Sequence, residues 1–374
     1  KKLVDKTQVS HAGVEGSSAQ STEEQPTDSK KATPPCLSLQ LVSDLHLEMY
    51  PDVKTACTYF DKIVRPKAKH LALLGDIGCW KPEPKKDARD ANIHKDRNQI
   101  LPAFLGYCAK RWETVIYLAG NHEFYSGRFH DPTPEASREA VMRRIQAECS
   151  KYPNVYFLEN GYVDLDGVRV FGATLWSHVP QESLRDVETA LNDYHMCCVT
   201  DDSAWVPPPE DGLRKILGLG GGSDAEKKKS TATNKSRKTG ARMFTVKDTN
   251  LWHKESREFL EKGIQQCTET KQPCVVLTHH APSFVGTSDP KFHDSPHRFA
   301  FSTNLHHLLH GEKKSGKYSS VRLWAFGHTH WCTDQVPMIQ FLNLCSVMAA
   351  LLDGGLRLRL REIMDAVYVC RLSR

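Results

Sequence analysis

Short apolar runs alternate with longer amphipathic stretches over most of the chain. Runs of five or six residues, rich in Val, Leu and Ile and almost uninterrupted by polar residues, are typical of strands buried on both faces of a sheet. We predict such strands at Leu39–Ser43, His70–Leu74, Thr114–Leu118, Val168–Ala173, Cys274–Thr278 and Arg322–Phe326. Later in the chain, apolar and polar residues alternate as in half-buried strands at Leu356–Leu360 and Ala366–Leu372.

The stretches between these strands carry apolar residues at helical spacing. In the longest of them, Lys247–Gln266, charged residues separate an apolar stripe made by Leu251, Trp252, Phe259, Leu260 and Ile264. Further helices are predicted at Thr55–Val64, Asn98–Arg111 and Thr133–Tyr152. Because strands and helices alternate along the chain, the sequence predicts an α/β fold.

Two segments lack this patterning. Residues 1–37 are rich in Ser, Thr, Glu, Gln and Lys, and we predict a disordered tail there because they offer little apolar surface to bury. Residues 207–243 open with three prolines and carry a glycine run before three lysines, which predicts a flexible, basic insertion. Patterned sequence lies on both sides, so we expect one domain over residues 38–374 that this insertion interrupts.

The charge of the chain is concentrated in that insertion. The 374 residues are 39% hydrophobic and 25% charged, which is ordinary for a soluble globular protein, and the net charge is +5. Residues 210–242 hold nine basic and four acidic side chains, which leaves 41 of each sign elsewhere. The body of the protein is therefore formally neutral, and only the insertion has the charge to seek an anionic partner such as nucleic acid.

Cysteine usage and apolar content indicate a cytoplasmic protein. Twelve cysteines are scattered between Cys36 and Cys370 without a CxxC pair, which predicts free thiols in a reducing compartment. We also expect no secretory signal, since no apolar stretch follows Lys1. One uncharged run, residues 335–352, has the length of a short membrane span, but it contains Pro, Gln, Asn and Ser. We interpret it as buried core, expect no membrane association, and leave the oligomeric state open.

Polar residues of metal-ligand type follow five of the predicted strands. The motifs are Ser43-Asp44-Leu45-His46, Gly75-Asp76, Gly120-Asn121-His122-Glu123, His279-His280 and Gly327-His328-Thr329-His330. Ligands of open α/β sheets bind at the carboxyl ends of strands, and a glycine there lets the backbone turn sharply. In extended chain, Asp44 and His46 point the same way, as do His328 and His330, so each pair is able to grip one ion.

Each motif alone has a simpler interpretation. A lone DxH or GD pair is common on protein surfaces, His279-His280 is consistent with one core and one exposed histidine, and Glu123 with a helix N-terminus. Five motifs in order, each at a strand end, favour a metal centre over coincidence. Seven ligands exceed what one ion takes but suit two ions that share a carboxylate. Carboxylate, imidazole and amide donors favour Mn, Fe, Zn or Co over Ca or Mg.

The succession D-x-H, GD, GNHE, a strand-end His and GHxH resembles the calcineurin-like metallophosphoesterase superfamily, over about Leu39 to Trp331. The resemblance implies a four-layer α/β/β/α sandwich of two mixed sheets flanked by helices. It also implies a hydrolase whose metal-bridging hydroxide attacks the phosphorus of a phosphate ester in line. Further stretches are similar to a broad, poorly characterised group of microbial and protist members: Ser43–Glu48, Gly120–Tyr125, Gly172–Trp176 and Leu191–Tyr194.

Carried over residue by residue, the resemblance implies two sets of ligands. Two divalent or trivalent ions (Mn, Fe or Zn) would share the bridging Asp76. The first would be held by Asp44, His46 and His330, and the second by Asn121, His279 and His328. We prefer His279 over His280 because it continues its strand directly. His122 matches the catalytic histidine of the family, and Glu123 would orient that imidazole or its neighbours.

The motifs identify a superfamily more clearly than they identify a substrate. Protein phosphatases of this superfamily carry GDxVDRG and RGNHE, whose arginines grip a phosphate dianion, whereas this chain has Gly75-Asp76-Ile77-Gly78-Cys79-Trp80 and Ala119-Gly120-Asn121-His122-Glu123. We therefore expect a diester or a small-molecule monoester as substrate rather than a phosphoprotein. The alternatives are a nuclease-like enzyme that holds nucleic acid through residues 207–243, a Ser/Thr protein phosphatase, and a non-catalytic scaffold that retains the fold.

Overall fold

The computed structural model describes residues 37–82, 91–126, 129–200, 240–310, 320–331, 333–335, 340–343 and 368–372. The predicted tail lies outside the described residues except for Leu37, which begins the first strand. The predicted insertion also lies outside them except for residues 240–243, of which Ala241–Met243 form a strand. The regular part of the chain therefore resumes before the predicted end of the insertion. The predicted strand Leu356–Leu360 is likewise outside the described residues.

The first sheet is parallel apart from one edge strand. Its order is β13-β1-β2-β3-β4, and β13 pairs antiparallel with β1. Its strands are β1 (Leu37–Val42), β2 (His70–Leu74), β3 (Thr114–Leu118), β4 (Val155–Phe157) and β13 (Tyr368–Leu372). Because β1, β2 and β3 run in the same direction, their carboxyl ends lie at one edge of the sheet.

The second sheet is mixed, with the order β11-β12-β10-β9-β6-β5. Its central strands β12, β10, β9 and β6 run parallel, and the outer pairs β11·β12 and β5·β6 are antiparallel. The strands are β5 (Gly161–Leu165), β6 (Val168–Ala173), β9 (Cys274–Thr278), β10 (Val321–Phe326), β11 (Thr333–Gln335) and β12 (Gln340–Asn343). A small two-stranded antiparallel sheet pairs β7 (Cys198–Thr200) with β8 (Ala241–Met243).

Helices flank both sheets. The α-helices are α1 (Val53–Ile63), α2 (Ala91–Arg97), α3 (Ile100–Ala109), α4 (Arg138–Cys149), α5 (Leu184–Ala190), α6 (Asp193–Met196), α8 (Val246–Glu269) and α9 (His306–His310). Single 3₁₀ turns cover Leu47–Met49, His122–Phe124, Pro134–Ala136, Gln181–Ser183, Pro290–Phe292 and Pro296–Ala300. Among the described residues, no helix combines the length and apolar character that crossing a membrane requires.

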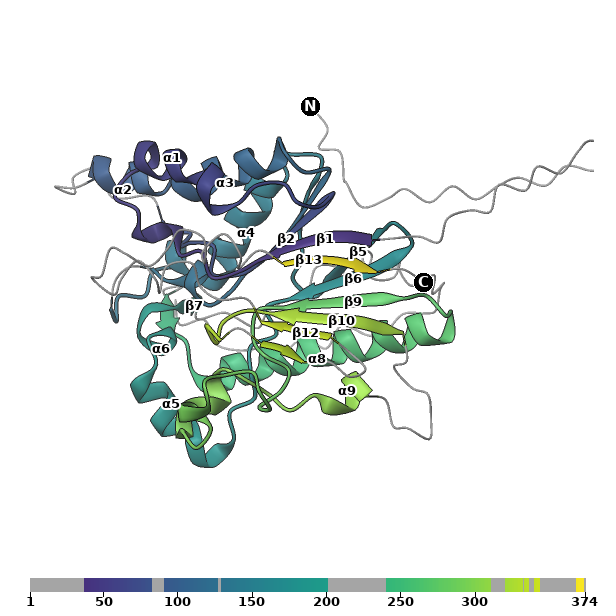
Figure 1. Ribbon diagram of the computed structural model, residues 1–374. Coiled ribbons are helices and arrows are strands. Elements are labelled where there is room, and N and C mark those ends of the chain that lie inside the picture. The colour runs from purple at the N-terminus through teal and green to yellow at the C-terminus, as the bar shows by residue number, and fades with distance from the viewer. Residues whose placement is uncertain are drawn as a thin grey trace, which may run out of the picture. The chain divides into compact units, whose positions relative to one another are not determined.

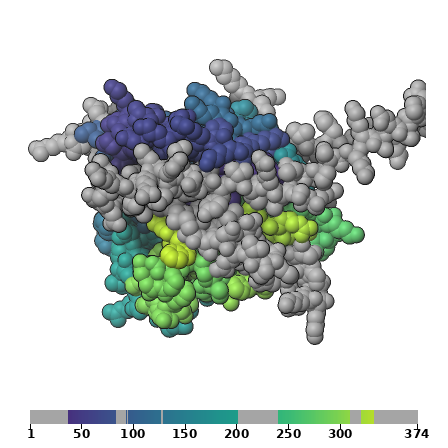
Figure 2. Space-filling model, in the orientation of Figure 1, coloured from purple at the N-terminus to yellow at the C-terminus, as the bar shows by residue number. Residues whose placement is uncertain are grey.

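The two sheets pack face to face over a fully apolar layer. This layer contains Leu39, Leu41, Leu74 and Leu118 from the first sheet and Val170, Leu277 and Leu323 from the second. On the outer face of the first sheet, α1, α3 and α4 contribute Phe60, Phe104 and Val141, and α8 covers the second sheet with Leu260 and Ile264. The result is the expected four-layer α/β/β/α sandwich (Figure 1). In the space-filling view, α1, in purple, lies along one edge and later, green parts of the chain lie along the other (Figure 2).

The predicted elements agree with the observed ones except at their ends. All six buried strands are present, and α8 begins at Val246, where Thr245 and Asp248 form a capping box. The predicted helix Thr133–Tyr152 is instead a 3₁₀ turn followed by α4. The hydroxyl of Ser137 accepts a hydrogen bond from the amide of Ala140 and thereby starts a new helix.

The eight cysteines that the structure describes with their side chains are free thiols, as expected: Cys57, Cys79, Cys108, Cys149, Cys197, Cys198, Cys267 and Cys274. Most of the uncharged run 335–352 lies outside the described residues. Its residues Gln340–Asn343 form β12, which pairs with β10 on one side and β11 on the other. This part of the run therefore belongs to a sheet.

Candidate metal centre

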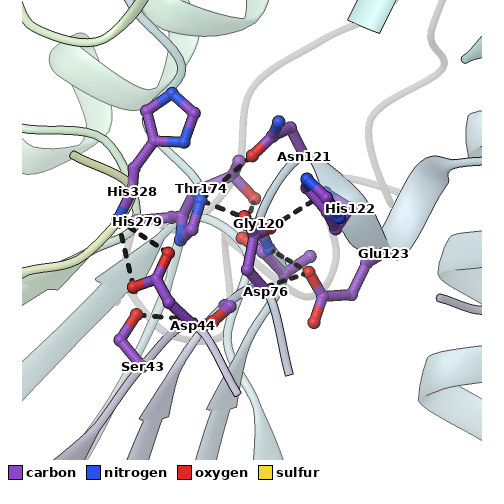
Figure 3. A network of polar contacts seen from close by, with 12 residues as sticks. Ser43, Asp44, Asp76, Gly120, Asn121, His122, Glu123, Thr174, His279 and His328 are labelled. Carbon is purple, nitrogen blue, oxygen red and sulfur yellow. Dashed lines mark hydrogen bonds and ion pairs between the residues drawn. The ribbon is translucent and has the colours of Figure 1, made fainter. Parts of the chain in front are cut away.

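The strand-end motifs converge where the carboxyl edges of the two sheets meet. Asp44 follows β1, Asp76 follows β2 and Asn121 follows β3, whereas His279 follows β9 and His328 follows β10. Figure 3 shows these side chains gathered into one network. Their convergence follows from the parallel pairing within each sheet and the face-to-face packing between sheets.

The first group of donors consists of Asp44, His46 and His330, whose ligand atoms all lie within 4.8 Å of one another. The Nε2 atom of His330 is 3.3 Å from the Oδ1 atom of Asp44 and 3.4 Å from the Nε2 atom of His46. These three residues are the ones that the resemblance implied for the first ion.

The second group consists of Asp76, His279 and His328, again within 4.8 Å of one another and all buried. The Nε2 atom of His279 is 3.4 Å from the Oδ1 atom of Asp76 and 3.1 Å from the Oδ1 atom of Asn121. Asn121 therefore adds an amide oxygen to this group. The carboxylate of Asp44 accepts a hydrogen bond from the backbone amide of His328 (3.1 Å), which links the two groups (Figure 3).

The backbone is left-handed at five of these residues. The φ angles are 55° at Asp44, 46° at His46, 51° at Asp76, 67° at His328 and 50° at His330. Non-glycine residues rarely adopt this conformation, and such strain clusters at functional sites. The expectation that His328 and His330 grip one ion from an extended chain is wrong, because these turns send the two side chains to different groups.

The glycines in the motifs serve close packing more than sharp turning. Only Gly75 among them has a positive φ, of 89°. A Cβ atom on Gly120 would lie 2.2 Å from the Oδ1 atom of Asp76, and one on Gly327 would lie 2.0 Å from the hydroxyl of Ser43. The turning role that the sequence suggested for these glycines therefore holds at Gly75, whereas Gly120 and Gly327 let neighbouring motifs approach.

We expect Gly120→Ala to weaken metal binding at the second group at least about tenfold, because the added methyl would push Asp76 and His279 apart and also overpack the site. Gly78→Ala is the matched control, since its Cβ would meet nothing closer than 3.6 Å. Isothermal titration of both metal-free variants with Mn²⁺ measures the difference. Equal affinities in the two variants would contradict the packing argument.

His279 and His280 have different surroundings. The Nδ1 atom of His279 lies 2.8 Å from the carbonyl oxygen of Leu74, so a hydrogen bond there leaves Nε2 as the nitrogen facing Asp76 and Asn121. The Nδ1 atom of His280 lies 3.2 Å from the carbonyl oxygen of Thr174, and its ring packs between those of Trp176 and His328. This geometry favours His279 as the ligand.

His122 lies beside both groups and is held from several sides. Its backbone amide donates to the Oδ1 atom of Asp76 (2.9 Å), its Nδ1 atom is 3.0 Å from the carboxylate of Glu48, and its ring stacks on Tyr125 at a centroid distance of 4.2 Å. Burial alone would lower the pKa of His122, but the charge of Asp76 and hydrogen bonds with Cys79 and Glu48 raise that pKa well above its usual value. The side chain is 28% exposed, so it can still reach a bound substrate.

Of the two roles expected for Glu123, orienting the His122 imidazole or orienting its neighbours, the contacts fit the second. Its fully buried carboxylate accepts hydrogen bonds from the backbone amides of Asp76 (2.8 Å), Ile77 (2.9 Å) and Gly120 (2.7 Å) and from the hydroxyl of Tyr117 (3.0 Å). Burial and the nearby charge of Asp76 raise the pKa of Glu123 to about 7. Glu123 thus ties the turn after β2 to the turn after β3.

Asn121 is oriented by the buried carboxylate of Asp193, a residue to which the sequence motifs assign no role. Its Nδ2 atom donates to the Oδ1 atom of Asp193 at 2.8 Å, which directs its Oδ1 atom toward His279. The same Asp193 oxygen accepts the hydroxyl of Tyr125 at 2.7 Å. Because Asp193 lies 72 residues after Asn121, its only sequence signal is the Leu191–Tyr194 stretch that is similar to family members.

We expect Asp193→Ala to lower metal affinity about 10- to 100-fold, the usual cost of losing a group that orients a metal ligand. The Asn121 amide would then be free to rotate its oxygen away from the site. Asp164→Ala provides the control, because Asp164 is half-exposed and pairs with Arg169 instead. Metal affinity by competition with a chromophoric chelator distinguishes the variants, and an unchanged affinity for Asp193→Ala would contradict this role.

The donor set suits transition-metal ions. Each group combines carboxylate and imidazole donors, and the second adds an amide oxygen, which are ligands that Mn, Fe and Zn accept. Burial alone would raise the pKa of Asp76, but the neighbouring His279 and His122 lower it well below its usual value. An ionised, buried Asp76 is what a cation between these groups requires.

Known proteins that are similar to this chain were found both by a family model and by sequence comparison. A family model described as calcineurin-like phosphoesterase matches residues 39–332. The uncharacterized protein L509 of Acanthamoeba polyphaga mimivirus is 27% identical over 303 residues, or 78% of this chain and 84% of that protein.

Two solved structures align with most of the chain. The phosphopantetheinyl hydrolase PptH of Mycobacterium tuberculosis aligns over 90% of this chain and 96% of its own, with 13% identity and a TM-score of 0.50. A dimetal phosphatase from Danio rerio aligns over 83% and 88%, with 14% identity and a TM-score of 0.39.

Proposed function

The chain belongs to the calcineurin-like phosphoesterase family, and we propose that it hydrolyses a phosphate ester with two metal ions held at the joint edge of its sheets. The observation that carries this proposal is the presence of two adjacent groups of three metal-ligand side chains, within the region that matches the family. A scaffold that had lost catalysis would not need both groups to be complete.

Each ion would have its own ligands. Asp44, His46 and His330 would hold the first, and Asn121, His279 and His328 would hold the second, with Asp76 shared between them. When bound, such ions act as Lewis acids that activate a water and neutralise charge on phosphoryl oxygens. The chain contributes rigid placement, because hydrogen bonds between the turns hold the donors in position before any ion arrives.

His122 would handle the proton of the leaving group. Its backbone amide donates to Asp76, which places the imidazole next to the second group. Its Nδ1 atom contacts Glu48, so Nε2 is the ring nitrogen that this contact leaves for the substrate. A histidine in this position can protonate the departing oxygen or stabilise its charge as the ester bond breaks. Glu123 would keep the turns that carry Asp76 and His122 at a fixed spacing.

The substrate we propose is a diester or a small-molecule monoester. The turn after β2 contains Gly78, Cys79 and Trp80 where protein phosphatases of the superfamily have an arginine, and Ala119 precedes Gly120 where they have another. A diester carries less charge than a monoester dianion and needs fewer cations to bind it. We therefore rank small molecules above phosphoproteins, and above nucleic acids.

The test combines metal analysis with a substrate panel. Protein stripped with a chelator would be reloaded with Mn²⁺, Zn²⁺ or Fe²⁺ and offered a nitrophenyl monoester, a bis-nitrophenyl diester, a phosphopeptide and single-stranded RNA. We expect two ions per chain and hydrolysis of the diester or the monoester that depends on reloading. A preparation with two ions that cleaves no ester would refute the enzyme assignment, and a preference for phosphopeptide would refute the substrate class.

A further inference from the structure

Glu48 contacts both a ligand of the first metal group and the candidate catalytic histidine through a single oxygen atom. Its Oε1 atom lies 3.2 Å from the Nδ1 atom of His46 and 3.0 Å from the Nδ1 atom of His122. Its other oxygen, Oε2, is buried and accepts no hydrogen bond from the described residues. A carboxylate that contacts both a candidate metal ligand and the candidate catalytic histidine is not part of the roles described above.

The local backbone fixes Glu48 in this position. His46 has a φ of 46°, and the 3₁₀ turn Leu47–Met49 begins directly after it. The amides of His46 and Leu47 donate to the carbonyl oxygens of Asp76 and Ile77, both at 2.9 Å. Because this turn is bonded to the turn after β2, the backbone of Glu48 is held beside the two imidazoles, and its side chain needs only a short reach to contact both.

The chemistry of the contact determines which ring nitrogens face the site. An ionised carboxylate only accepts hydrogen bonds, so each imidazole must present an N–H group at Nδ1. In His46 the lone pair is then on Nε2, the atom that lies 3.4 Å from the Nε2 atom of His330. In His122 the same constraint leaves Nε2 as the nitrogen that exchanges a proton.

We propose that Glu48 is a positioning residue that fixes the tautomer and ring orientation of His46 and His122 together, and so couples the first metal group to proton delivery. The catalytic part of this inference rests on the proposed phosphoesterase function, whereas the tautomer part rests on the contacts alone. The ring of Tyr125 stacks on that of His122 at an interplanar angle of 25° and limits the tilt of the imidazole plane. The contact with Glu48 determines which edge of the imidazole carries Nδ1 toward the carboxylate.

The first test is spectroscopic and needs no activity. In ¹⁵N-labelled protein, long-range ¹H–¹⁵N correlations report the tautomer of each histidine, with His46→Ala and His122→Ala spectra assigning the signals. At a pH high enough for the His122 ring to be neutral, we expect the Nδ1–H form for both rings in the zinc-loaded wild type and a mixture of forms in Glu48→Ala. Unchanged tautomers in Glu48→Ala would overturn the proposal even if the enzyme proves active.

The second test uses the leaving group. If His122 delivers a proton, phenyl esters need it more than nitrophenyl esters, whose leaving groups are stable anions. We expect Glu48→Ala to lower kcat about 10- to 100-fold for a phenyl ester and less than about threefold for a nitrophenyl ester. Glu48→Gln retains an accepting oxygen and should recover part of this loss.

A double variant separates positioning from a general structural role. In the His122→Ala background, the further change Glu48→Ala should leave the ratio of phenyl to nitrophenyl rates unaltered, because residues that act as a unit are not additive. Equal losses on both esters, or additive losses in the double variant, would overturn the catalytic part of the proposal. A wild type that cleaves no ester would refute the proposed function and leave the spectroscopic test to decide the tautomer part.

Discussion

Replacing His279 by alanine is expected to remove one of the two ions and to lower phosphoesterase activity by about a thousandfold or more. His279 is fully buried, its Nε2 atom is 3.4 Å from Asp76 and 3.1 Å from Asn121, and its other nitrogen lies 2.8 Å from the Leu74 carbonyl oxygen. Losing it would leave the second group without a central donor. An ion that contributes several kcal/mol of transition-state stabilisation corresponds to a rate factor of about 10³.

His280→Ala is the matched control for this prediction. Its side chain is also fully buried, but it contacts the Thr174 carbonyl oxygen and the rings of Trp176 and His328 and belongs to neither assigned group. We expect this variant to lose about 2–4 kcal/mol of stability through lost packing and yet to bind two ions. Elemental analysis and thermal unfolding of both variants distinguish the outcomes. If His280→Ala lost an ion and His279→Ala kept both, our assignment of the ligand would be reversed.

The buried strands were predictable because their apolar runs are continuous. A strand that is covered on both faces, such as β2 or β9, has no side that faces solvent. Its sequence is therefore a short, continuous apolar run, which differs from the spaced apolar residues of an amphipathic helix. The shorter elements carry no such signal. β4 has only three residues and β7 pairs with β8 across 40 residues of chain, so tertiary contacts decide their conformation.

The convergence of the candidate metal ligands was predictable because the parallel sheets bring strand ends together. A motif after each of several parallel strands is sufficient to place Asp44, Asp76 and Asn121 at one edge, whatever the details of packing. The division into two groups was not accessible from spacing, because it depends on left-handed φ angles at residues such as His328 and His330. Only the resemblance to a family separated them in advance.

The supporting residues were missed for a different reason. Glu48 reaches His122 across 74 residues and Asp193 reaches Asn121 across 72, so neither contact follows from local pattern. Glu48 carries a faint signal, since it continues the D-x-H spacing by two residues. Glu123 was expected to orient the His122 imidazole or its neighbours, and only the second alternative fits, because its carboxylate turns inward to backbone amides of the neighbouring turns.

Replacing His122 by alanine should lower activity about 10²- to 10⁴-fold without removing either ion. His122 lies within ligand distance of His46 and Glu48, but it is absent from the two groups that we assign to the ions. Asp76→Asn is the contrasting variant. Asp76 lies in the second group and its pKa is depressed by His279 and His122, so losing its charge should weaken metal binding as well as activity.

The two variants together separate proton handling from metal binding. Elemental analysis should find two ions in His122→Ala and fewer in Asp76→Asn, while both are slow on a phenyl ester. A small, strongly acidic leaving group should restore most of the rate in His122→Ala and little in Asp76→Asn, because only the first variant retains the metal centre. If both variants kept full activity in a metal-loaded preparation, the chain would not use this site for hydrolysis, and the convergence of its motifs would need another explanation.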